Sequence, residues 1–233
     1  MKTLFLRTLT GIAYLSILAF AFFLPQSSQN YALPAVFTVF LGVALFEYFN
    51  LFQNFPAPKN GLQRITRRWI LPIVWIIIPL VLLIYWCIVM SSTNIVVALF
   101  IILCMNDTMA YIFGTLLGKH KMWQRVSPKK SWEGFFGGLI STMTVCYFII
   151  HIAYFQNNIF KTSFIWMGFA FVVIISGTFG DFFESMVKRF ANQKDSGTLL
   201  PGHGGILDRI DSMLFAVPAG FIYWGLVSIF CIF

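Results

Sequence analysis

"FIWMGFAFVVIISGTFGDFFES", residues 164–185, contains no lysine or arginine, and its two acidic residues both lie near its end. A helix needs about 20 mostly apolar residues to cross about 30 Å of hydrocarbon, so this stretch predicts a membrane span. Similar stretches occur at about residues 8–24, 31–51, 69–90, 95–118, 134–155 and 212–232. The sequence therefore predicts an all-α fold, a polytopic transmembrane helical bundle of about seven spans.

The composition agrees with a membrane protein and excludes a soluble one. Of the 233 residues, 59% are hydrophobic and 10% are charged, and the spans leave room only for short loops. We expect a single integral membrane domain over residues 1–233, whose first span is a retained anchor and not a cleaved signal peptide. The four cysteines stand singly inside predicted spans, a pattern that indicates neither a zinc site nor a disulfide framework.

The basic residues predict the orientation of the chain. If the N-terminus is cytoplasmic, every one of the 16 lysines and arginines except Lys161 falls in a cytoplasmic segment. We therefore expect a cytoplasmic N-terminus and a C-terminus on the far side of the membrane. All eight acidic residues fall in the cytoplasmic half of a span or in a cytoplasmic loop. Because charges inside a membrane usually face a bundle interior or a watery cavity, this placement predicts a charged cavity that opens to the cytoplasm.

The segment "NDTMAYIFGTLLGKHKMWQRVSPKKSWEGFFGG", residues 106–138, contains the first charged group. Asp107, Tyr111, Gly114 and Gly118 are spaced by four, three and four residues, so a helix places them on one stripe. The two glycines allow a ligand or another helix to approach this stripe closely.

The "SPKKSWEG" part of this segment, residues 127–134, joins two predicted helices. Ser127 precedes Lys129 and Lys130, and Glu133 begins the next helix. A helix N-terminus with two lysines suits an anion, because unpaired N–H groups and cationic side chains then point to one place. A capped turn whose lysines anchor the chain to the membrane explains the pattern equally well.

The second charged group is "GTFGDFFESMVKRF", residues 177–190, at the predicted cytoplasmic end of the sixth span. Asp181, Glu184, Ser185 and Lys188 recur at i, i+3, i+4 and i+7 and so share one face of a helix. A solvated helix end is the simple alternative. Because Asp181 follows a long apolar run, however, its carboxylate needs a cationic partner or a metal ion.

The third group follows at once. The segment "KDSGTLLPGHGG", residues 194–205, predicts a flexible loop around His203 whose backbone N–H groups can approach a phosphate. Asp208, Arg209 and Asp211 come next, at the start of the last span. Carboxylates beside cations are typical of a magnesium–nucleotide site. If the two flanking helices are antiparallel neighbours, Asp181 and Asp208 can face each other, with one magnesium ion or two between them.

These residues resemble the signature of the phosphatidate cytidylyltransferases, also called CDP-diacylglycerol synthases. The positions that fill the signature are Ser185, Lys188, Arg189, Lys194, Asp195, Gly197, Leu200, Pro201, His203, Gly204, Gly205, Asp208, Arg209 and Asp211. The upstream "NDTMAYIFG" and "SPKKSWEGFFGG" are similar to a second block of the family, which CTP-dependent polyprenol kinases also share. The resemblance covers about residues 100–233, so residues 1–100 are variable N-terminal spans and residues 101–233 are the catalytic half.

The resemblance implies a magnesium-dependent nucleotidyltransferase that converts CTP and phosphatidic acid into CDP-diacylglycerol and pyrophosphate, in phospholipid biosynthesis. It implies a multi-pass protein of the cytoplasmic membrane in bacteria, with its active site facing the cytoplasm. It also implies a homodimeric helical bundle whose metal ligands are Asp181 and Asp208, with a second cation as an option. Lipid is the expected environment, and no nucleic-acid partner is expected.

The expected roles of the remaining residues follow from their charge. The catalytic candidates are Asp208, Asp211, Lys188, Lys194, Arg209 and His203. The candidates for substrate contacts are Asp107, Ser127, Lys129, Lys130, Glu133, Ser185 and Arg189. The bases are expected to hold phosphates, and Asp211 is expected to bind a second cation or to orient Arg209.

Two other functions fit parts of the pattern. A CTP-dependent lipid kinase is supported by the upstream block alone, and it would transfer the γ-phosphoryl group and not the nucleotidyl group. A cation-coupled transporter also places acids inside spans. Transporters, however, are often built from inverted repeats, and we find no internal repeat in this sequence.

Overall fold

The computed structural model describes residues 26–90, 93–149, 163–197, 199 and 204–230, together with positions 16, 20, 21 and 24. In chain order the elements are α2 (Gln26–Gln53), α3 (Gly61–Ile65), the π-helical turns η1 (Thr66–Ile70) and η2 (Ile73–Ile77), α4 (Ile78–Ile88), α5 (Thr93–Leu116), β1 (Lys121–Trp123), β2 (Ser127–Ser131), α6 (Trp132–Ile149), α8 (Ser163–Phe190) and α9 (Leu207–Phe230). The predicted helical bundle is confirmed.

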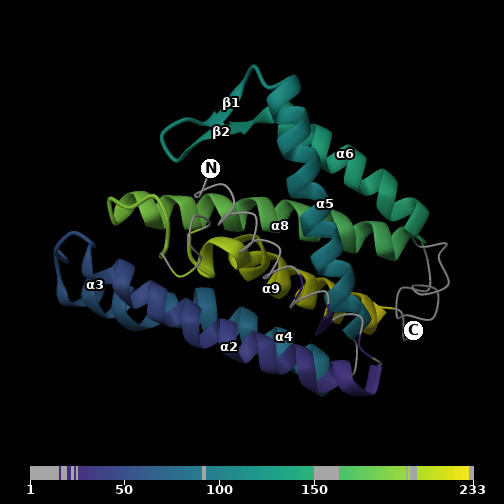
Figure 1. The fold of residues 1–233 in the computed structure, drawn as a ribbon, viewed down its shortest axis with the longest axis horizontal. Helices are drawn as coiled ribbons and strands as arrows, with labels where there is room; N and C mark the ends of the chain where they lie inside the picture. The colour runs from purple at the N-terminus through teal and green to yellow at the C-terminus, as the bar shows by residue number, and fades with distance from the viewer. Residues whose placement is uncertain are drawn as a thin grey trace.

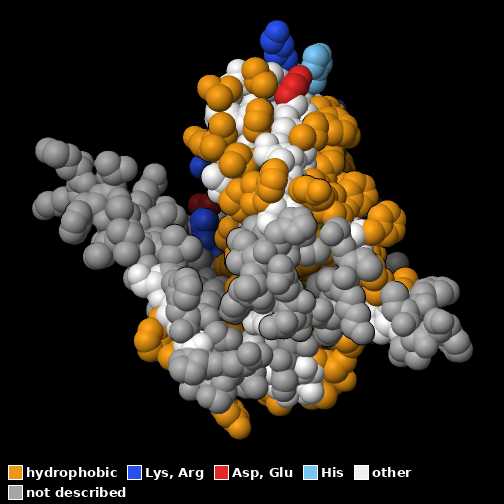
Figure 2. All heavy atoms as spheres, turned by 90° about the vertical axis from the view of Figure 1, so that its right-hand side faces the viewer, with side chains coloured by type: hydrophobic (Ala, Val, Ile, Leu, Met, Phe, Trp, Pro, Cys, Tyr) orange, Lys and Arg blue, Asp and Glu red, His pale blue; other side chains and the backbone are white. Residues whose placement is uncertain are grey.

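Among the described residues, five helices are long and apolar enough to cross a membrane: Tyr31–Gln53, Gly61–Ile88, Thr93–Leu116, Phe164–Phe190 and Leu207–Ile229. They match five of the predicted spans, and α6 (Trp132–Ile149) begins where a sixth was predicted. The first predicted span, at about residues 8–24, falls almost wholly outside the described residues. Hydrophobic side chains cover most of the coloured surface in Figure 2, as expected of a protein surrounded by lipid. The chain is a multi-pass integral membrane protein.

The helix Gly61–Ile88 contains two wide turns that no periodicity predicted. The π-helical turns η1 and η2 end two residues before Pro72 and Pro79, respectively. A proline ring clashes with the carbonyl four residues earlier, and its nitrogen cannot donate a hydrogen bond. A wide turn ahead of the proline accommodates both effects and lets the helix continue.

The centre of the bundle is the antiparallel pair α8 and α9, which run side by side in Figure 1. The helices α2 and α4 lie together along one side, and α5 crosses α8 and α9 before α6 returns. Phe169 and Ile174 of α8, Val217 of α9 and Trp86 of α4 are fully buried between these helices. The turn around α3, the end of α8 and the start of α9 therefore lie at the same end of the molecule.

Small residues allow α5 and α6 to touch backbone to backbone, as the glycine stripe predicted. A Cβ atom added to Gly134 would lie 2.7 Å from the carbonyl oxygen of Ala110 and 3.0 Å from the Cα of Gly114. One added to Gly138 would lie 3.0 Å from the Cβ of Ala110. The partner that approaches the α5 stripe is thus helix α6.

Gly134→Ala should lower the melting temperature of the detergent-solubilised protein, because the carbonyl of Ala110 cannot move away without disturbing α5. Gly225→Ala is the matched control, since an added Cβ there meets nothing within 4 Å. It should leave the melting temperature unchanged or raise it, because alanine favours a helix over glycine. Equal melting temperatures for the Gly134 variant and the wild type would contradict the close packing.

The segment between α5 and α6 is an antiparallel hairpin, which the sequence did not predict. Lys121 pairs with Ser131, and the N–H of Trp132 donates to the carbonyl of His120 at 2.9 Å. The Glu133 carboxylate accepts from the His120 N–H at 3.1 Å and lies 2.6 Å from its ring Nδ1. These long-range pairs close the base of the hairpin, and they project β1 and β2 beyond the helices (Figure 1).

Candidate active site

The most buried ionic contact of the described residues joins α8 to α9. Lys188 Nζ lies 2.6 Å from Glu184 Oε2, one helical turn earlier, and 2.6 Å from Asp208 Oδ1 on the neighbouring helix. The Glu184 side chain is 0% exposed, and those of Lys188 and Asp208 are 13% and 7% exposed. A buried charge is costly without partners, so this triad fixes the end of α8 against the start of α9. The helical face that the spacing predicted is confirmed.

Asp208 also holds the loop that precedes α9. Its Oδ2 accepts hydrogen bonds from the backbone N–H groups of Ser196, at 2.9 Å, and of Gly205, at 2.7 Å. Gly204 has a φ of +80°, and a Cβ on it would lie 2.4 Å from Asp208 Oδ2. Glycine is the residue that adopts this backbone conformation without strain, so the loop can close tightly around the carboxylate.

A second ion pair connects the hairpin to α8. Lys130 Nζ on β2 lies 2.6 Å from Asp181 Oδ2 and 4.3 Å from the centre of the Phe182 ring. The Ser185 hydroxyl donates to Asp181 Oδ1 at 3.4 Å. Both side chains of the pair are partly accessible, with 25% of Lys130 and 30% of Asp181 exposed. The pair is therefore more accessible to solvent than the Lys188 triad.

Two more carboxylates belong to the same charged region. The carboxylate of Asp211 is repelled electrostatically by those of Asp181 and Asp107, whereas Asp107 is attracted by Lys130. The absence of a side chain at Gly180 allows α8 and α9 to approach closely here, since a Cβ on Gly180 would lie 2.6 Å from the backbone oxygen of Asp211. The structure thus brings Asp107, Asp181, Asp211 and Lys130 into one region. A single ion between Asp181 and Asp208 stays a prediction.

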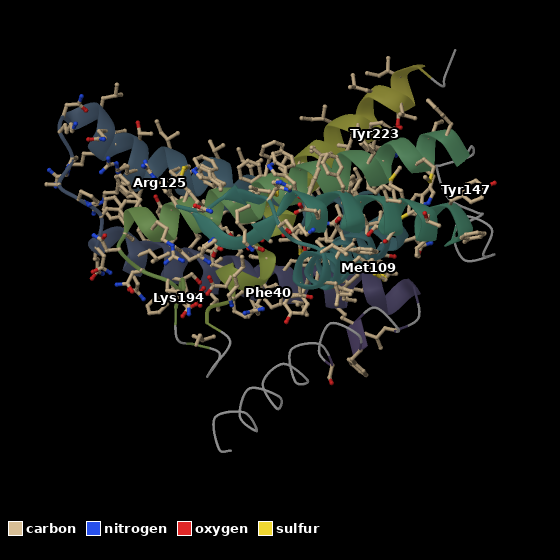
Figure 3. All side chains as sticks on the ribbon, turned by 90° about the horizontal axis from the view of Figure 1, so that it is seen from above. Phe40, Met109, Arg125, Tyr147, Lys194 and Tyr223 are labelled. Carbon is tan, nitrogen blue, oxygen red and sulfur yellow. The ribbon has the colours of Figure 1, made fainter. Side chains whose placement is uncertain are left out.

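The other predicted residues lie around this region. Lys194, Arg209, Arg189 and Lys129 are exposed, Ser127 is half-buried, and His203 lies outside the described residues. Figure 3 places Lys194 and Arg125 toward one end of the molecule, opposite Tyr147 and Tyr223. Several lysine and arginine side chains are therefore accessible at the charged end.

Glu133 departs from the expected cluster. It binds His120 at the base of the hairpin and no lysine among the described residues. Hydrogen bonds from its own backbone N–H, and then from the ring and N–H of His120, lower the pKa of Glu133 to about 2. The contacts of Glu133 with His120 stabilise the base of the hairpin.

One buried acid was missed as a site residue. Glu47 of α2 is 2% exposed, and its carboxylate accepts hydrogen bonds from Ser196 Oγ and from the backbone N–H groups of Ile206 and Leu207. The signal in the sequence was a lone acid inside an apolar span. Periodicity could not have shown that its partners lie about 150 residues later.

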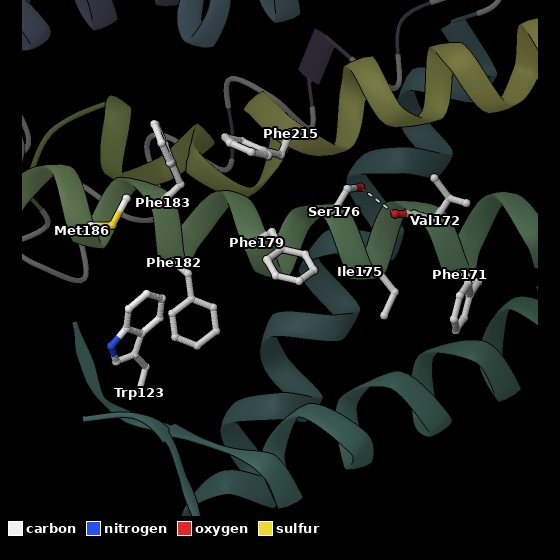
Figure 4. Close-up of a pocket in the computed structure, with 10 residues that line it drawn as sticks. All are labelled: Trp123, Phe171, Val172, Ile175, Ser176, Phe179, Phe182, Phe183, Met186 and Phe215. Atoms are coloured by element: carbon white, nitrogen blue, oxygen red, sulfur yellow. Dashed lines mark hydrogen bonds between the residues drawn. The ribbon is translucent and has the colours of Figure 1, made fainter. Parts of the chain in front are cut away.

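Two cavities border the charged region. A polar pocket of about 430 Å³ lies between the end of α2 and the loop before α9, and its lining includes Asn50, Asn54, Gln193 and Lys194. An apolar pocket of about 530 Å³ follows α8 (Figure 4). Its lining residues are Trp123, Phe171, Val172, Ile175, Ser176, Phe179, Phe182, Phe183, Met186 and Phe215. The apolar pocket includes Phe182, whose ring centre lies 4.3 Å from Lys130 Nζ.

Comparison with known proteins agrees with these observations. Phosphatidate cytidylyltransferases of Staphylococcus haemolyticus and Staphylococcus saprophyticus are each 46% identical over 121 residues, and that of Staphylococcus aureus is 44% identical over 119 residues. Each match covers 51% of this chain and 44% of the relative, so the matched stretch spans less than half of those proteins. A model of the cytidylyltransferase family matches residues 3–227. The chain belongs to the cytidylyltransferase family.

Proposed function

We propose that the chain is a phosphatidate cytidylyltransferase, which joins CTP and phosphatidic acid to form CDP-diacylglycerol and pyrophosphate. The observation that carries the proposal is the position of the charged region. The ion pairs of Lys188 with Asp208 and of Lys130 with Asp181 lie at one end of α8, beside an apolar pocket along the same helix. One site can then meet a charged nucleotide and a lipid together. The relatives named phosphatidate cytidylyltransferase support this assignment.

In the proposed reaction a phosphate oxygen of phosphatidate attacks the α-phosphorus of CTP. The bond to the bridging oxygen breaks, and pyrophosphate leaves with the electron pair. The attacking phosphate is already ionised near neutral pH, so no general base is required. The protein supplies orientation and neutralises charge. Lys188, Lys194 and Arg209 would hold the triphosphate, and Lys130 is placed to meet the lipid phosphate.

Magnesium is part of the proposal. Among the residues that the structure describes, no three acidic, histidine or cysteine side chains converge on a metal position. Lysine ammonium groups lie against Asp181 and Asp208 at 2.6 Å, so each carboxylate already has a cation beside it. Carboxylate oxygens are also the ligands that Mg²⁺ prefers. Asp181 and Asp208 would hold the ion, with Asp211 available for a second cation. Bound magnesium would neutralise charge on the triphosphate.

The apolar pocket fits the lipid end of the substrate. Figure 4 shows Trp123 of the hairpin beside Phe182, and Phe171, Ile175 and Phe179 along the adjoining face of α8. An acyl chain placed there would leave its phosphate near Lys130, whose ammonium group lies over Phe182. We propose that phosphatidate enters sideways from the bilayer along this face.

The proposal includes a location and an assembly. The bacterial relatives and the distribution of lysine and arginine support the cytoplasmic membrane, with the charged end facing the cytoplasm. A homodimer is proposed on the family resemblance.

Lys130→Met should lower kcat/KM for phosphatidate by about tenfold or more, because a charge-assisted hydrogen bond to a phosphate is lost. The measurement is initial-rate kinetics in mixed micelles at varied phosphatidate and saturating CTP. Lys121→Met is the matched control, since Lys121 is an exposed lysine on the other strand of the hairpin. Equal losses in both variants would show that Lys130 contributes only general surface charge.

The proposed function is tested by following pyrophosphate release from the purified protein in detergent with CTP, phosphatidate and magnesium. Release should require both substrates and should stop when the metal is chelated. Release of pyrophosphate without phosphatidate, or no release with all components present, would reject the proposal.

A further inference from the structure

Glu47 connects the N-terminal helices to the loop that carries the proposed nucleotide site. Its Oε1 accepts from the Ile206 N–H at 3.0 Å, and its Oε2 accepts from the Leu207 N–H at 2.8 Å and from Ser196 Oγ at 3.2 Å. Leu207 is the first residue of α9. The first N–H groups of a helix have no partner within the helix, so Glu47 caps α9 from a different span.

The loop is shaped to fit this carboxylate. A Cβ added to Gly205 would lie 2.3 Å from Glu47 Oε2 and 2.2 Å from Ser196 Oγ, and one added to Gly197 would lie 2.9 Å from Glu47 Oε1. Two glycines of the signature therefore lie directly against a side chain of α2. The position of Glu47 therefore requires their small size.

Ser196 transmits the contact to the charged triad. Its hydroxyl donates to Glu47, and its backbone N–H donates to Asp208 Oδ2 at 2.9 Å. Asp208 in turn holds Lys188 at 2.6 Å. An unbroken chain of hydrogen bonds thus runs from α2 through Ser196 and Asp208 to Lys188.

We propose that Glu47 is a positioning residue for CTP: it fixes the loop before α9, and so sets the place of Asp208 and Lys188 around the triphosphate. This inference rests on the proposed function. It assigns a role in the reaction to the N-terminal half of the chain. The proposed chemistry of the site then depends on a span that the signature does not include.

Glu47→Gln is the first test. A glutamine oxygen can replace one carboxylate oxygen, but its amide nitrogen would then face a backbone N–H donor. The KM for CTP should rise by about tenfold, the factor expected for one lost charge-assisted hydrogen bond, while the KM for phosphatidate stays within about twofold. Glu47→Asp keeps both oxygens and should recover part of the affinity for CTP. A variant that simply folds less well would lose maximal rate and keep both KM values.

Tyr48→Phe is the matched control on the same helix turn. The Tyr48 hydroxyl donates to the backbone carbonyl of Arg67, away from the loop, and its side chain is fully buried. Its loss should lower the melting temperature without changing the KM for CTP. If the Glu47→Gln and Tyr48→Phe variants have the same KM for CTP, the positioning role is wrong.

Hydrogen–deuterium exchange of the purified protein gives a readout that does not depend on activity. Peptides that cover residues 195–207 should exchange faster in Glu47→Gln than in wild type, and those of α5 and α6 should be unchanged. Unchanged exchange in the loop would overturn the inference, even if the enzyme turns over CTP. A wild type that protects this loop but does not convert CTP and phosphatidate would instead reject the proposed function.

Discussion

Asp208→Asn should reduce CTP-dependent formation of lipid product by at least about two orders of magnitude, the size of metal and electrostatic contributions in comparable sites. An asparagine can present its oxygen to the N–H groups of Ser196 and Gly205. Its amide nitrogen would then face the ammonium group of Lys188, which Asp208 now binds at 2.6 Å. The proposed magnesium ligand and the anchor of Lys188 are lost together.

The measurement is a turnover assay on protein that elutes as a single species in size-exclusion chromatography. Ser196→Ala gives a comparison, because it removes only the hydroxyl that donates to Glu47 and leaves the backbone N–H bond of residue 196 to Asp208 in place. That variant should lose far less activity. Near-normal turnover of Asp208→Asn would remove Asp208 from the mechanism.

Lys188→Met should produce the largest loss of stability. Glu184 has a fully buried side chain, and Asp208 is nearly so, and both would lose the ammonium group at 2.6 Å. Removing one partner of a buried ion pair costs about 3 to 5 kcal/mol, because the remaining charge is left without compensation. Thermal unfolding in detergent should show a melting temperature well below that of the wild type.

The double variant Lys188→Met/Glu184→Gln separates stability from activity. Neutralising Glu184 removes one of the two uncompensated charges and leaves that of Asp208, so the melting temperature should recover in part. Turnover should stay low, because the cation proposed for the triphosphate is still missing. Recovery of both properties would show that Lys188 acts only in folding.

Local patterns in the sequence predicted much of the fold. The apolar stretch at 164–185 became α8, which continues to Phe190 and so keeps Lys188 on the helix. Glycine spacing predicted the close approach to α5, since Gly114 and Gly118 leave part of its stripe without side chains. The hairpin was not predicted, because its pairing depends on contacts such as that of Lys121 with Ser131, ten residues apart.

Local patterns in the sequence also predicted some contacts of the candidate site and missed others. The contact between Glu184 and Lys188 follows from i, i+4 spacing. Antiparallel flanking helices were expected to bring Asp208 opposite Asp181, whereas the contact that the structure gives Asp208 across the two helices is with Lys188. The partnership of Glu47 with Ile206 was not foreseen. No local rule connects residues 159 positions apart, and the glycines that accommodate Glu47 look like ordinary loop residues until the chain is folded.

The most direct test of the central claim follows two isotopic labels. Purified protein is incubated with phosphatidate, magnesium and CTP labelled at either the α- or the γ-phosphorus, and the lipid phase is extracted. Nucleotidyl transfer predicts that the α-label enters the lipid as CDP-diacylglycerol and that the γ-label leaves as pyrophosphate. A γ-label in the lipid, with CDP in the aqueous phase, would identify a lipid kinase and contradict the account.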